Sequence, residues 1–304
     1  MAERRRIEFP SGGDICVGYV YPPARPDASE AACCIVLAHG FGGTQEGSLA
    51  RTATDFAAAG FTAMSFDYRF LGESGGEPRQ LIDIKAQHAD WHAAIAFART
   101  LPGVRADRIA IWGSSLGGGH VLAVAQQDPT VAAVVAQVPF IRFPRKVEGR
   151  SRADTRRLLR AILADWWAGR TGRPPRYIKS AGLPGELAVM ATPQAARTVA
   201  VLDNPTWRNE VAPRVLLEMW LTYRPGRRAG DMRMPVLFSL AEGDREGPVE
   251  FARPVALRVP RGQLRTYPCA HFEFYDEAVR PTVAADQISF LRTHLVGFPG
   301  LAAA

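Results

Sequence analysis

Three residues of the types that act together in nucleophilic catalysis occur along this sequence, in the order Ser115, Asp244 and His271. A serine hydroxyl is a weak nucleophile at neutral pH, so a neutral imidazole must take its proton during attack on a carbonyl group. A carboxylate must then fix the tautomer of that imidazole and stabilise its charged form. The three residues therefore predict acyl-group chemistry through a covalent intermediate.

Ser115 lies at the centre of a Gly-x-Ser-x-Gly pattern, between Gly113 and Gly117. The apolar run 109–112 precedes the pattern and predicts a buried strand, while residues 116–127 predict a helix of small residues. A sharp turn between them needs small residues beside its apex and exposes the apex side chain at the end of the sheet. The alternative is a serine in an ordinary glycine-rich loop, and the flanking strand and helix argue against it.

His271 and Asp244 follow predicted strands further along the chain. His271 comes after the last strand, residues 263–267, and Asp244 after the strand at 235–240. Carboxyl ends of parallel strands share one edge of a sheet, where open α/β sheets build their sites. The competing residues are Glu242 and Glu246 for the acid, and His39, His88, His92, His120 and His294 for the base.

Two backbone N–H groups are expected to hold the negative oxygen of the tetrahedral intermediate. One belongs to Leu116 at the start of the nucleophile helix, where the helix dipole assists. The other belongs to Phe41, in a glycine-rich loop shaped by His39 and Gly40. The alternative for that loop is a simple turn. His88 and His92 lie one helical turn apart without a third nearby ligand, so we expect a solvated helix face and no metal site.

The positioning elements alternate between strands and helices. The order predicts an α/β fold with a doubly wound, mostly parallel sheet and an antiparallel edge hairpin at residues 7–21. Residues 140–231 lack a buried-strand run and predict a largely helical cap insertion. Three segments result: residues 1–139 and 232–304 form the two parts of the core, and residues 140–231 form the cap. The remaining expected strands are 32–38, 62–66 and 131–138, and the remaining expected helices are 49–59, 82–100, 151–167, 211–223, 249–259 and 283–295.

Composition narrows the class of protein. The 304 residues are 47% hydrophobic and 22% charged, which is typical of a soluble globular chain. No apolar run reaches the roughly 18–20 residues of a membrane span. The chain has four cysteines, and two of them, Cys33 and Cys34, are adjacent in a predicted core strand. This pattern does not indicate a disulfide framework, so we expect the protein to reside in the reducing cytoplasm. No motif accompanies the net charge of +7 to indicate nucleic-acid binding.

Basic residues crowd the start of the predicted cap. Two interpretations remain open: a solvated basic helix, or a cationic entrance for an anionic acyl carrier such as coenzyme A or a carrier-protein phosphopantetheine. The residues are Arg142, Arg145, Lys146, Arg150, Arg152, Arg156, Arg157 and Arg160.

Together these motifs resemble the α/β-hydrolase superfamily, and within it the dienelactone-hydrolase-like group, including hydrolases and acyl transferases of fungal polyketide pathways and their bacterial relatives. The segments that carry the resemblance are 39–43, 66–79, 113–117, 190–193, 223–225 and 243–244, with His271. The resemblance implies cleavage of an ester, thioester or lactone, or acyl transfer, without a cofactor. The chain has Ser115 where dienelactone hydrolases use cysteine, so a small dienelactone is not the expected substrate.

The expected partner is a small acyl substrate, including a coenzyme A or carrier-protein thioester, with no nucleic acid or membrane partner. Homodimer formation is left open. Because the fold also occurs in proteins without catalysis, a non-catalytic ligand binder is the alternative of a different class.

Overall fold

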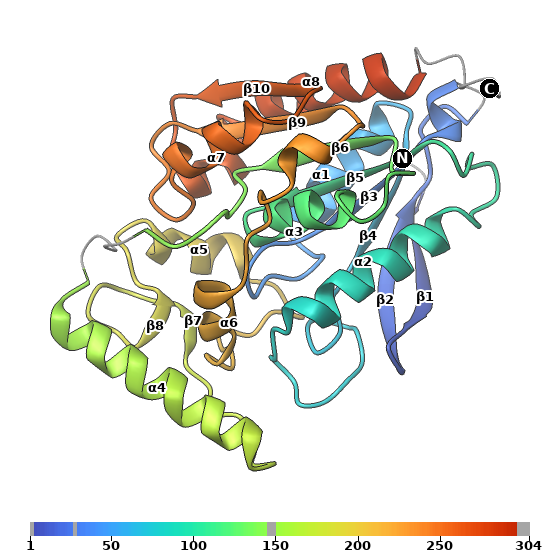
Figure 1. Ribbon diagram of the computed structural model, residues 1–304. Coiled ribbons are helices and arrows are strands. Elements are labelled where there is room, and N and C mark those ends of the chain that lie inside the picture. The colour runs from blue at the N-terminus through green and yellow to red at the C-terminus, as the bar shows by residue number, and fades with distance from the viewer. Residues whose placement is uncertain (1–2, 27–28, 145–149, 297–304) are drawn as a thin grey trace.

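The computed structural model describes residues 3–26, 29–144 and 150–296. Its main sheet has the strand order β1-β2-β4-β3-β5-β6-β9-β10 (Figure 1). β1 and β2 form an antiparallel edge hairpin, β2 runs antiparallel to β4, and the other neighbouring strands are parallel. The strands are β1 (Arg5–Ser11), β2 (Asp14–Tyr21), β3 (Cys34–Ala38), β4 (Thr62–Phe66), β5 (Ile109–Ser114), β6 (Ala133–Gln137), β9 (Val236–Ala241) and β10 (Gly262–Tyr267).

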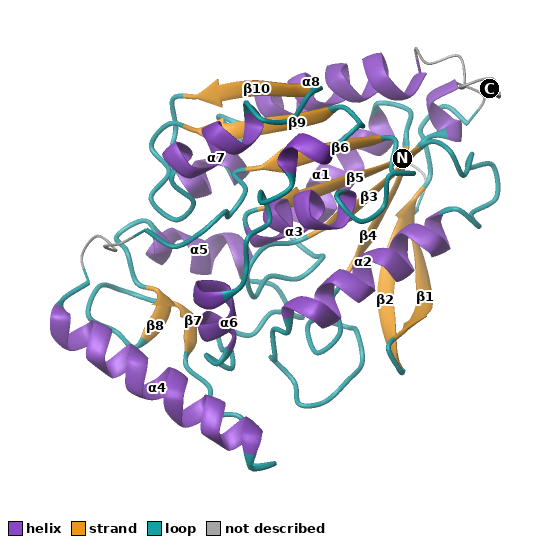
Figure 2. Cartoon of the chain, viewed as in Figure 1, coloured by secondary structure: helices purple, strands orange, loops and turns teal. Residues whose placement is uncertain are grey.

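Helices cover both faces of this sheet (Figure 2). Because successive side chains of a strand point to opposite faces, β3 sends Ile35 toward Phe56 of α1 and Val36 toward Trp91 of α2. Cover on both faces explains why the central strands are continuous apolar runs. The structure confirms the predicted doubly wound, mostly parallel sheet. The helices are α1 (Ser48–Ala58) and α8 (Arg280–Leu291) on one face, and α2 (Ile84–Ala98), α3 (Leu116–Ala125) and α7 (Val249–Ala256) on the other.

Strand register aligns the carboxyl ends of the central strands. Ala38, at the end of β3, pairs with Phe66 of β4 and with Gly113 of β5. Ala241 of β9 pairs in the same way with Tyr267 of β10. The residues that follow these ends therefore emerge at one edge of the sheet, and they include His39, Asp67, Ser115, Asp244 and His271.

Between β6 and β9 the chain leaves the sheet, and we refer to residues 140–231 as the cap (Figure 1). A partly buried ion pair joins α4 to the start of α6: the guanidinium of Arg214 donates to both carboxylate oxygens of Asp165, at 2.8 and 2.9 Å. Two parallel bonds of this kind are among the stronger side-chain contacts in proteins. The cap elements are α4 (Arg152–Arg170), β7 (Lys179–Ala181), β8 (Ala188–Met190), α5 (Ala195–Leu202) and α6 (Val215–Leu221).

The cap differs in detail from the sequence prediction. β7 and β8 form a small parallel sheet that was not predicted, because three-residue strands are too short to show an alternating pattern. α6 begins at Val215 and not at Val211, since Val211 pairs with Ile178 in a β-bridge. The helix α5 was also missed. Within the described residues, no helix combines the length and apolar character required to cross a membrane.

Candidate active site

Ser115 connects β5 to α3 in a strained backbone conformation, with φ of 57° and ψ of −118°. A positive φ is unfavourable for a residue with a side chain, so neighbouring bonds must hold it. The Ser115 N–H donates to the carbonyl of Gln137 at 3.0 Å, and its own carbonyl accepts from the N–H groups of Phe140 and Gly119 at 2.8 and 3.0 Å. These bonds fix the hydroxyl at the end of the sheet.

The glycines around Ser115 are required by close backbone packing. A Cβ at Gly113 would lie 2.2 Å from the carbonyl oxygen of Gly117. A Cβ at Gly117 would lie 2.5 Å from the carbonyl oxygen of His39, and one at Gly40 would lie 2.9 Å from Cβ of Ser115. The turn after β5 therefore packs directly on the loop after β3, with no space for a side chain between them.

The structure brings Ser115, His271 and Asp244 together in one hydrogen-bonded row. Nε2 of His271 lies 3.2 Å from Oγ of Ser115, and Nδ1 lies 2.7 Å from Oδ2 of Asp244. The other carboxylate oxygen of Asp244 accepts the N–H groups of Glu246 and Gly247 at 2.9 and 2.7 Å. Asp244 is thereby oriented on one side and bonded to the imidazole on the other.

The environment of His271 favours its charged form. Burial by itself would lower the pKa of His271, but the charge of Asp244 and the hydrogen bond that its carboxylate accepts from the ring outweigh burial and raise that pKa above its usual value. The carboxylate of Glu246 adds a smaller contribution in the same direction. An imidazolium formed by proton transfer from Ser115 would be stabilised here.

Among the described residues, neither alternative acid is hydrogen-bonded to the ring of His271. The side chain of Glu242 is exposed. The carboxyl group of Glu246 is largely buried and accepts a hydrogen bond from the hydroxyl of Thr192, and burial raises its pKa. Asp244 is the carboxylate that bonds the His271 ring.

The hydroxyl of Ser114, next to the nucleophile candidate, is hydrogen-bonded to residues other than His271. Its hydroxyl lies 2.7 Å from the hydroxyl of Tyr275 and accepts from the side-chain amide of Gln137 at 3.1 Å. Tyr275 also lines the cavity beside Ser115. The sequence pattern did not single out Tyr275, because a tyrosine four residues after His271 carries no spacing signal of its own.

Two backbone N–H groups close to Ser115 have no hydrogen-bond partner within the described residues. Neither Phe41 nor Leu116 donates its N–H to any acceptor in the described parts of the chain. The first N–H groups of a helix lack intrahelical acceptors, so the Leu116 donor is left free by the start of α3. Both donors are thus available to a negatively charged oxygen.

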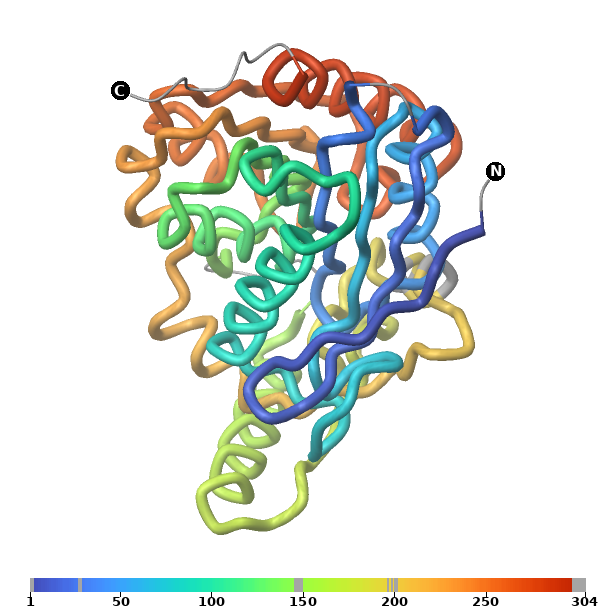
Figure 3. Tube along the Cα trace, turned by 90° about the vertical axis from the view of Figure 1, so that its right-hand side faces the viewer, coloured from blue at the N-terminus to red at the C-terminus, as the bar shows by residue number. Residues whose placement is uncertain are grey.

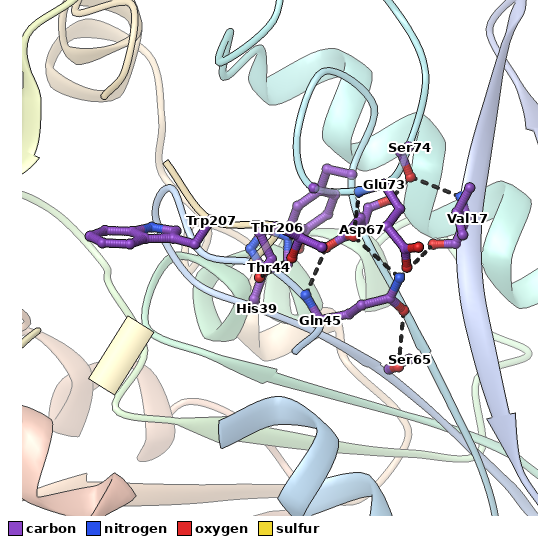
Figure 4. A network of polar contacts seen from close by, with 12 residues as sticks. Val17, His39, Thr44, Gln45, Ser65, Asp67, Glu73, Ser74, Thr206 and Trp207 are labelled. Atoms are coloured by element: carbon purple, nitrogen blue, oxygen red, sulfur yellow. Dashed lines mark hydrogen bonds and ion pairs between the residues drawn. The ribbon is translucent and has the colours of Figure 1, made fainter. Parts of the chain in front are cut away.

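A buried polar network holds the loop that carries Phe41 (Figure 4). Asp67 accepts the backbone N–H of Gln45 at 2.7 Å, its side-chain amide at 3.2 Å, and the N–H of Glu73 at 2.9 Å. Burial raises the pKa of Asp67 to about 7 and lowers that of His39 to about 4. Neutral His39 can then donate from Nδ1 to the carbonyl of Gly40, 2.9 Å away. The sequence singled out His39 and Gly40 as supports of this loop, but it did not indicate Asp67, Gln45 or Glu73 as site residues.

The cap is bonded directly to the same loop. The indole N–H of Trp207 donates to the carbonyl of Gly42 at 2.8 Å. The hydroxyl of Thr206 lies 3.2 Å from that of Thr44 (Figure 4). Sequence reasoning missed these contacts, since they join residues more than 160 positions apart. The shape of the loop beside Ser115 therefore depends on the position of the cap.

Two cavities meet at Ser115, and both are lined mainly by apolar side chains. Phe41, Ser115 and Met190 line both of them. The first cavity is completed by residues including Leu49, Trp112, Leu202, Phe272 and Tyr275. The second is completed by residues including Phe140, Phe143, Met219, Arg150 and Glu246. An extended apolar substrate could occupy both cavities with a carbonyl group at Ser115.

The other helix-borne histidines have structural surroundings. Nε2 of His88 lies 3.1 Å from Nδ1 of His120, which also lies 3.1 Å from the hydroxyl of Tyr223. The expectation of a solvated face was therefore wrong for His88: it packs against α3, and burial lowers its pKa to about 4. No group of metal-binding side chains is found among the residues that the structure describes.

The basic residues at the start of the cap differ in their surroundings. Arg145 and Lys146 lie outside the described residues. Arg150 lines the second cavity and donates to the carbonyl of Val189 at 2.6 Å. Arg142 and Arg157 are engaged with Phe251 and Asp154, whereas Arg152, Arg156 and Arg160 are exposed on α4.

Comparison with known proteins identifies the family of this chain. Residues 29–277 match the model of the serine aminopeptidase, S33, family. The quorum-quenching protein AidA of Acinetobacter baumannii is 37% identical over 288 residues, which cover 94% of this chain and 93% of AidA. The thiohydrolase apmlB of Arthrinium phaeospermum is 29% identical over 255 residues, with 80% of each chain covered.

Solved structures agree on the fold. The α/β hydrolase GrgF from Penicillium superimposes with a TM-score of 0.80 at 22% identity, covering 98% of this chain and all of GrgF. DcsB, solved with a substrate analogue, superimposes with a TM-score of 0.79 at 21% identity, covering 97% of this chain and all of DcsB. The family match, the relatives and the sheet topology lead to one conclusion: this chain belongs to the serine aminopeptidase S33 family of α/β-hydrolase enzymes.

Proposed function

We propose that the chain is a serine hydrolase that cleaves a carboxylic ester, thioester or lactone through an acyl-enzyme intermediate. The observation that carries the proposal is the row of hydrogen bonds from Ser115 through His271 to Asp244. Beside it, the free N–H groups of Phe41 and Leu116 would form the oxyanion hole. These are the parts that acyl transfer to a serine requires.

In the proposed reaction, Nε2 of His271 takes the proton of Ser115 while Oγ attacks the substrate carbonyl carbon. The N–H groups of Phe41 and Leu116 stabilise the negative oxygen of the tetrahedral intermediate. His271 then gives the proton to the leaving oxygen or sulfur, and the acyl group stays on Ser115. A water molecule, deprotonated by His271, attacks the acyl-enzyme, and His271 returns that proton to Oγ of Ser115 as the acid is released. Asp244 keeps Nδ1 protonated throughout.

The cavities support an apolar acyl group as the substrate class. Their walls are largely aromatic and aliphatic, so most of the substrate surface would be removed from water. The name of apmlB, a thiohydrolase, adds support for a thioester among the candidate bonds.

Acyl transfer is the second candidate, and the arrangement of two cavities at one serine favours it. An acceptor alcohol or amine in one cavity would attack the acyl-enzyme in place of water. Polyketide transferase ATR5 of Stachybotrys chlorohalonatus, 34% identical over 187 residues, carries a name of this class. A non-catalytic ligand binder would have no need for the bonded row at Ser115.

The first prediction concerns the nucleophile. Replacing Ser115 with Ala should lower kcat by roughly 10⁴–10⁶-fold in a folded protein, because no other group supplies the attacking oxygen. Ser114→Ala is the matched control: it removes a hydroxyl one position away that bonds Tyr275 and should leave most of the activity. A fluorophosphonate should label Ser115, as read by peptide mass spectrometry. Activity in the Ser115→Ala variant, or labelling at Ser114, would contradict the assignment.

A second prediction uses the pH profile of His271. As the general base, His271 must be neutral, so kcat/KM should fall as pH drops through its raised pKa. Asp244→Asn should lower kcat by about 10⁴-fold. It should also shift the fall of kcat/KM at acid pH to lower pH. The reason is that burial then lowers the pKa of His271 without the Asp244 charge that raised it.

Glu242→Gln is the control for the acid, since its exposed side chain is not bonded to the ring. That variant should keep both rate and profile. If Asp244→Asn retained the wild-type pH profile and rate while Glu242→Gln lost them, the carboxylate that acts with His271 would be Glu242.

The third prediction separates hydrolysis from transfer. With a p-nitrophenyl ester of a medium-length acyl chain, we expect the free acid as product even when primary alcohols are present, because water reaches the acyl-enzyme. Chromatography of the products measures the ratio of acid to new ester. Ester as the main product at millimolar acceptor would assign the chain to the transferases and retain the triad.

The fourth prediction addresses an anionic thioester substrate such as acyl-coenzyme A. Arg150 brings a cationic guanidinium to the second cavity, and charge-assisted bonds to phosphate suit it. Arg150→Gln should lower kcat/KM for the coenzyme A thioester roughly tenfold more than for a neutral ester of the same acyl group. Arg157→Gln, exposed and paired with Asp154, is the control. Equal losses on both substrates would exclude recognition of the carrier by Arg150.

A further inference from the structure

The outer face of α4 carries large apolar side chains that are exposed to solvent. Leu159, Leu163, Trp166 and Trp167 are 46%, 56%, 38% and 58% exposed. Their spacing of three and four residues places them on one side of the helix. The opposite side is buried in the cap through residues such as Leu158, Ile162 and Asp165. A continuous apolar row of this kind on a surface marks an interaction site.

The position of α4 sets this row apart from the catalytic centre. α4 lies along the outer edge of the cap, and it projects beyond the sheet in the rotated view (Figures 1 and 3). None of the four exposed residues lines either cavity at Ser115. Binding of the acyl substrate at Ser115 therefore does not account for their exposure.

The charged residues on the same face of α4 are cationic. Arg152, Arg156 and Arg160 are exposed, and none forms an ion pair with a residue within the described ranges. Arg170 stacks over the ring of Trp166, 5.2 Å from its centroid.

The two acidic residues of α4 do not balance this charge. Asp154 forms an ion pair with Arg157, and Asp165 is fully buried against Arg214. The outer face is thus apolar and positively charged along its whole length.

We propose that this face of α4 docks onto an anionic lipid surface, with the helix axis parallel to the membrane plane. Leucine and tryptophan side chains would enter the boundary between head groups and acyl chains, where indole rings are favoured. The arginines beside them would reach the lipid phosphates while their stems stay in apolar surroundings. The chain would then lie on a membrane without spanning it.

Charge and shape favour lipid over a protein partner. A two-fold pairing of two copies centred on Leu163 would bring Arg156 of one copy against Arg170 of the other, since both positions are seven residues from the centre. Like charges in such contact are destabilising. An acidic folded protein would need a groove matched to this convex ridge, whereas a fluid lipid interface adapts to it.

The test measures sedimentation of the full chain with vesicles. One set contains equal parts of phosphatidylglycerol and phosphatidylcholine, and the other contains phosphatidylcholine alone. We expect binding to the anionic set, with loss at high salt. Trp166→Ala combined with Trp167→Ala, and separately Arg156→Gln combined with Arg160→Gln, should each lower partitioning roughly tenfold.

Trp220→Ala provides the matched control, because Trp220 is 62% exposed on α6 and outside the outer face of α4. It should bind vesicles like the wild type. Turnover of a water-soluble ester and the thermal transition should stay unchanged in the α4 variants, which shows that they fold.

Three results would overturn the proposal. The first is equal binding to both vesicle sets, or none to either. The second is unchanged vesicle binding in the α4 variants. The third is binding of a protein, in place of vesicles, to this face. It would be seen as a wild-type dimer without lipid that becomes a monomer when Trp166→Ala and Trp167→Ala are combined. It would also be seen as saturable binding of an acidic acyl carrier protein.

Discussion

The close approach of two backbone segments governs this structure. The turn after β5 and the loop after β3 pack so tightly that a single Cβ at Gly117 or Gly40 would overlap the neighbouring segment. The positive φ of Ser115 costs about 1–3 kcal/mol, and the backbone bonds of Ser115 hold it at this contact. Because the donors of Phe41 and Leu116 belong to the same two segments, the approach also sets the distance between them.

Two buried histidines at this edge of the sheet show how local bonding controls charge. His271 has a carboxylate within hydrogen-bond distance, so its pKa is raised despite burial. His39 lies 3.7 Å from Asp67, whose oxygens are already bonded to amide groups, and burial lowers the pKa of His39 to about 4. The surroundings of one ring favour a bound proton, while the other ring stays neutral and supports a loop.

The sequence predicted the core because the core depends on local patterns. Buried strands such as β3, at Cys34–Ala38, appear as uninterrupted apolar runs, and the glycines beside Ser115 mark a turn that only small residues permit. The grouping of Ser115, Asp244 and His271 followed from the shared edge of parallel strands. Their catalytic roles remain predictions.

The structure of the cap, and the polar network that supports the loop of Phe41, could not be predicted in the same way. β7 and β8 are too short to show a period, and their pairing depends on the tertiary structure. Nothing near Asp67 in the sequence indicates that its carboxylate accepts a hydrogen bond from Gln45. The exposure of Leu163 and Trp167 also follows from which side of α4 packs inward.

The bond from Trp207 to the carbonyl of Gly42 has a mechanical consequence. Gly42 directly follows Phe41, so the peptide beside the proposed oxyanion donor is held by a side chain of the cap. A substitution at Trp207 would therefore act on a core loop 165 positions away in the sequence. The shape of the cavity at Ser115 is in this way set jointly by the loop after β3 and by the cap.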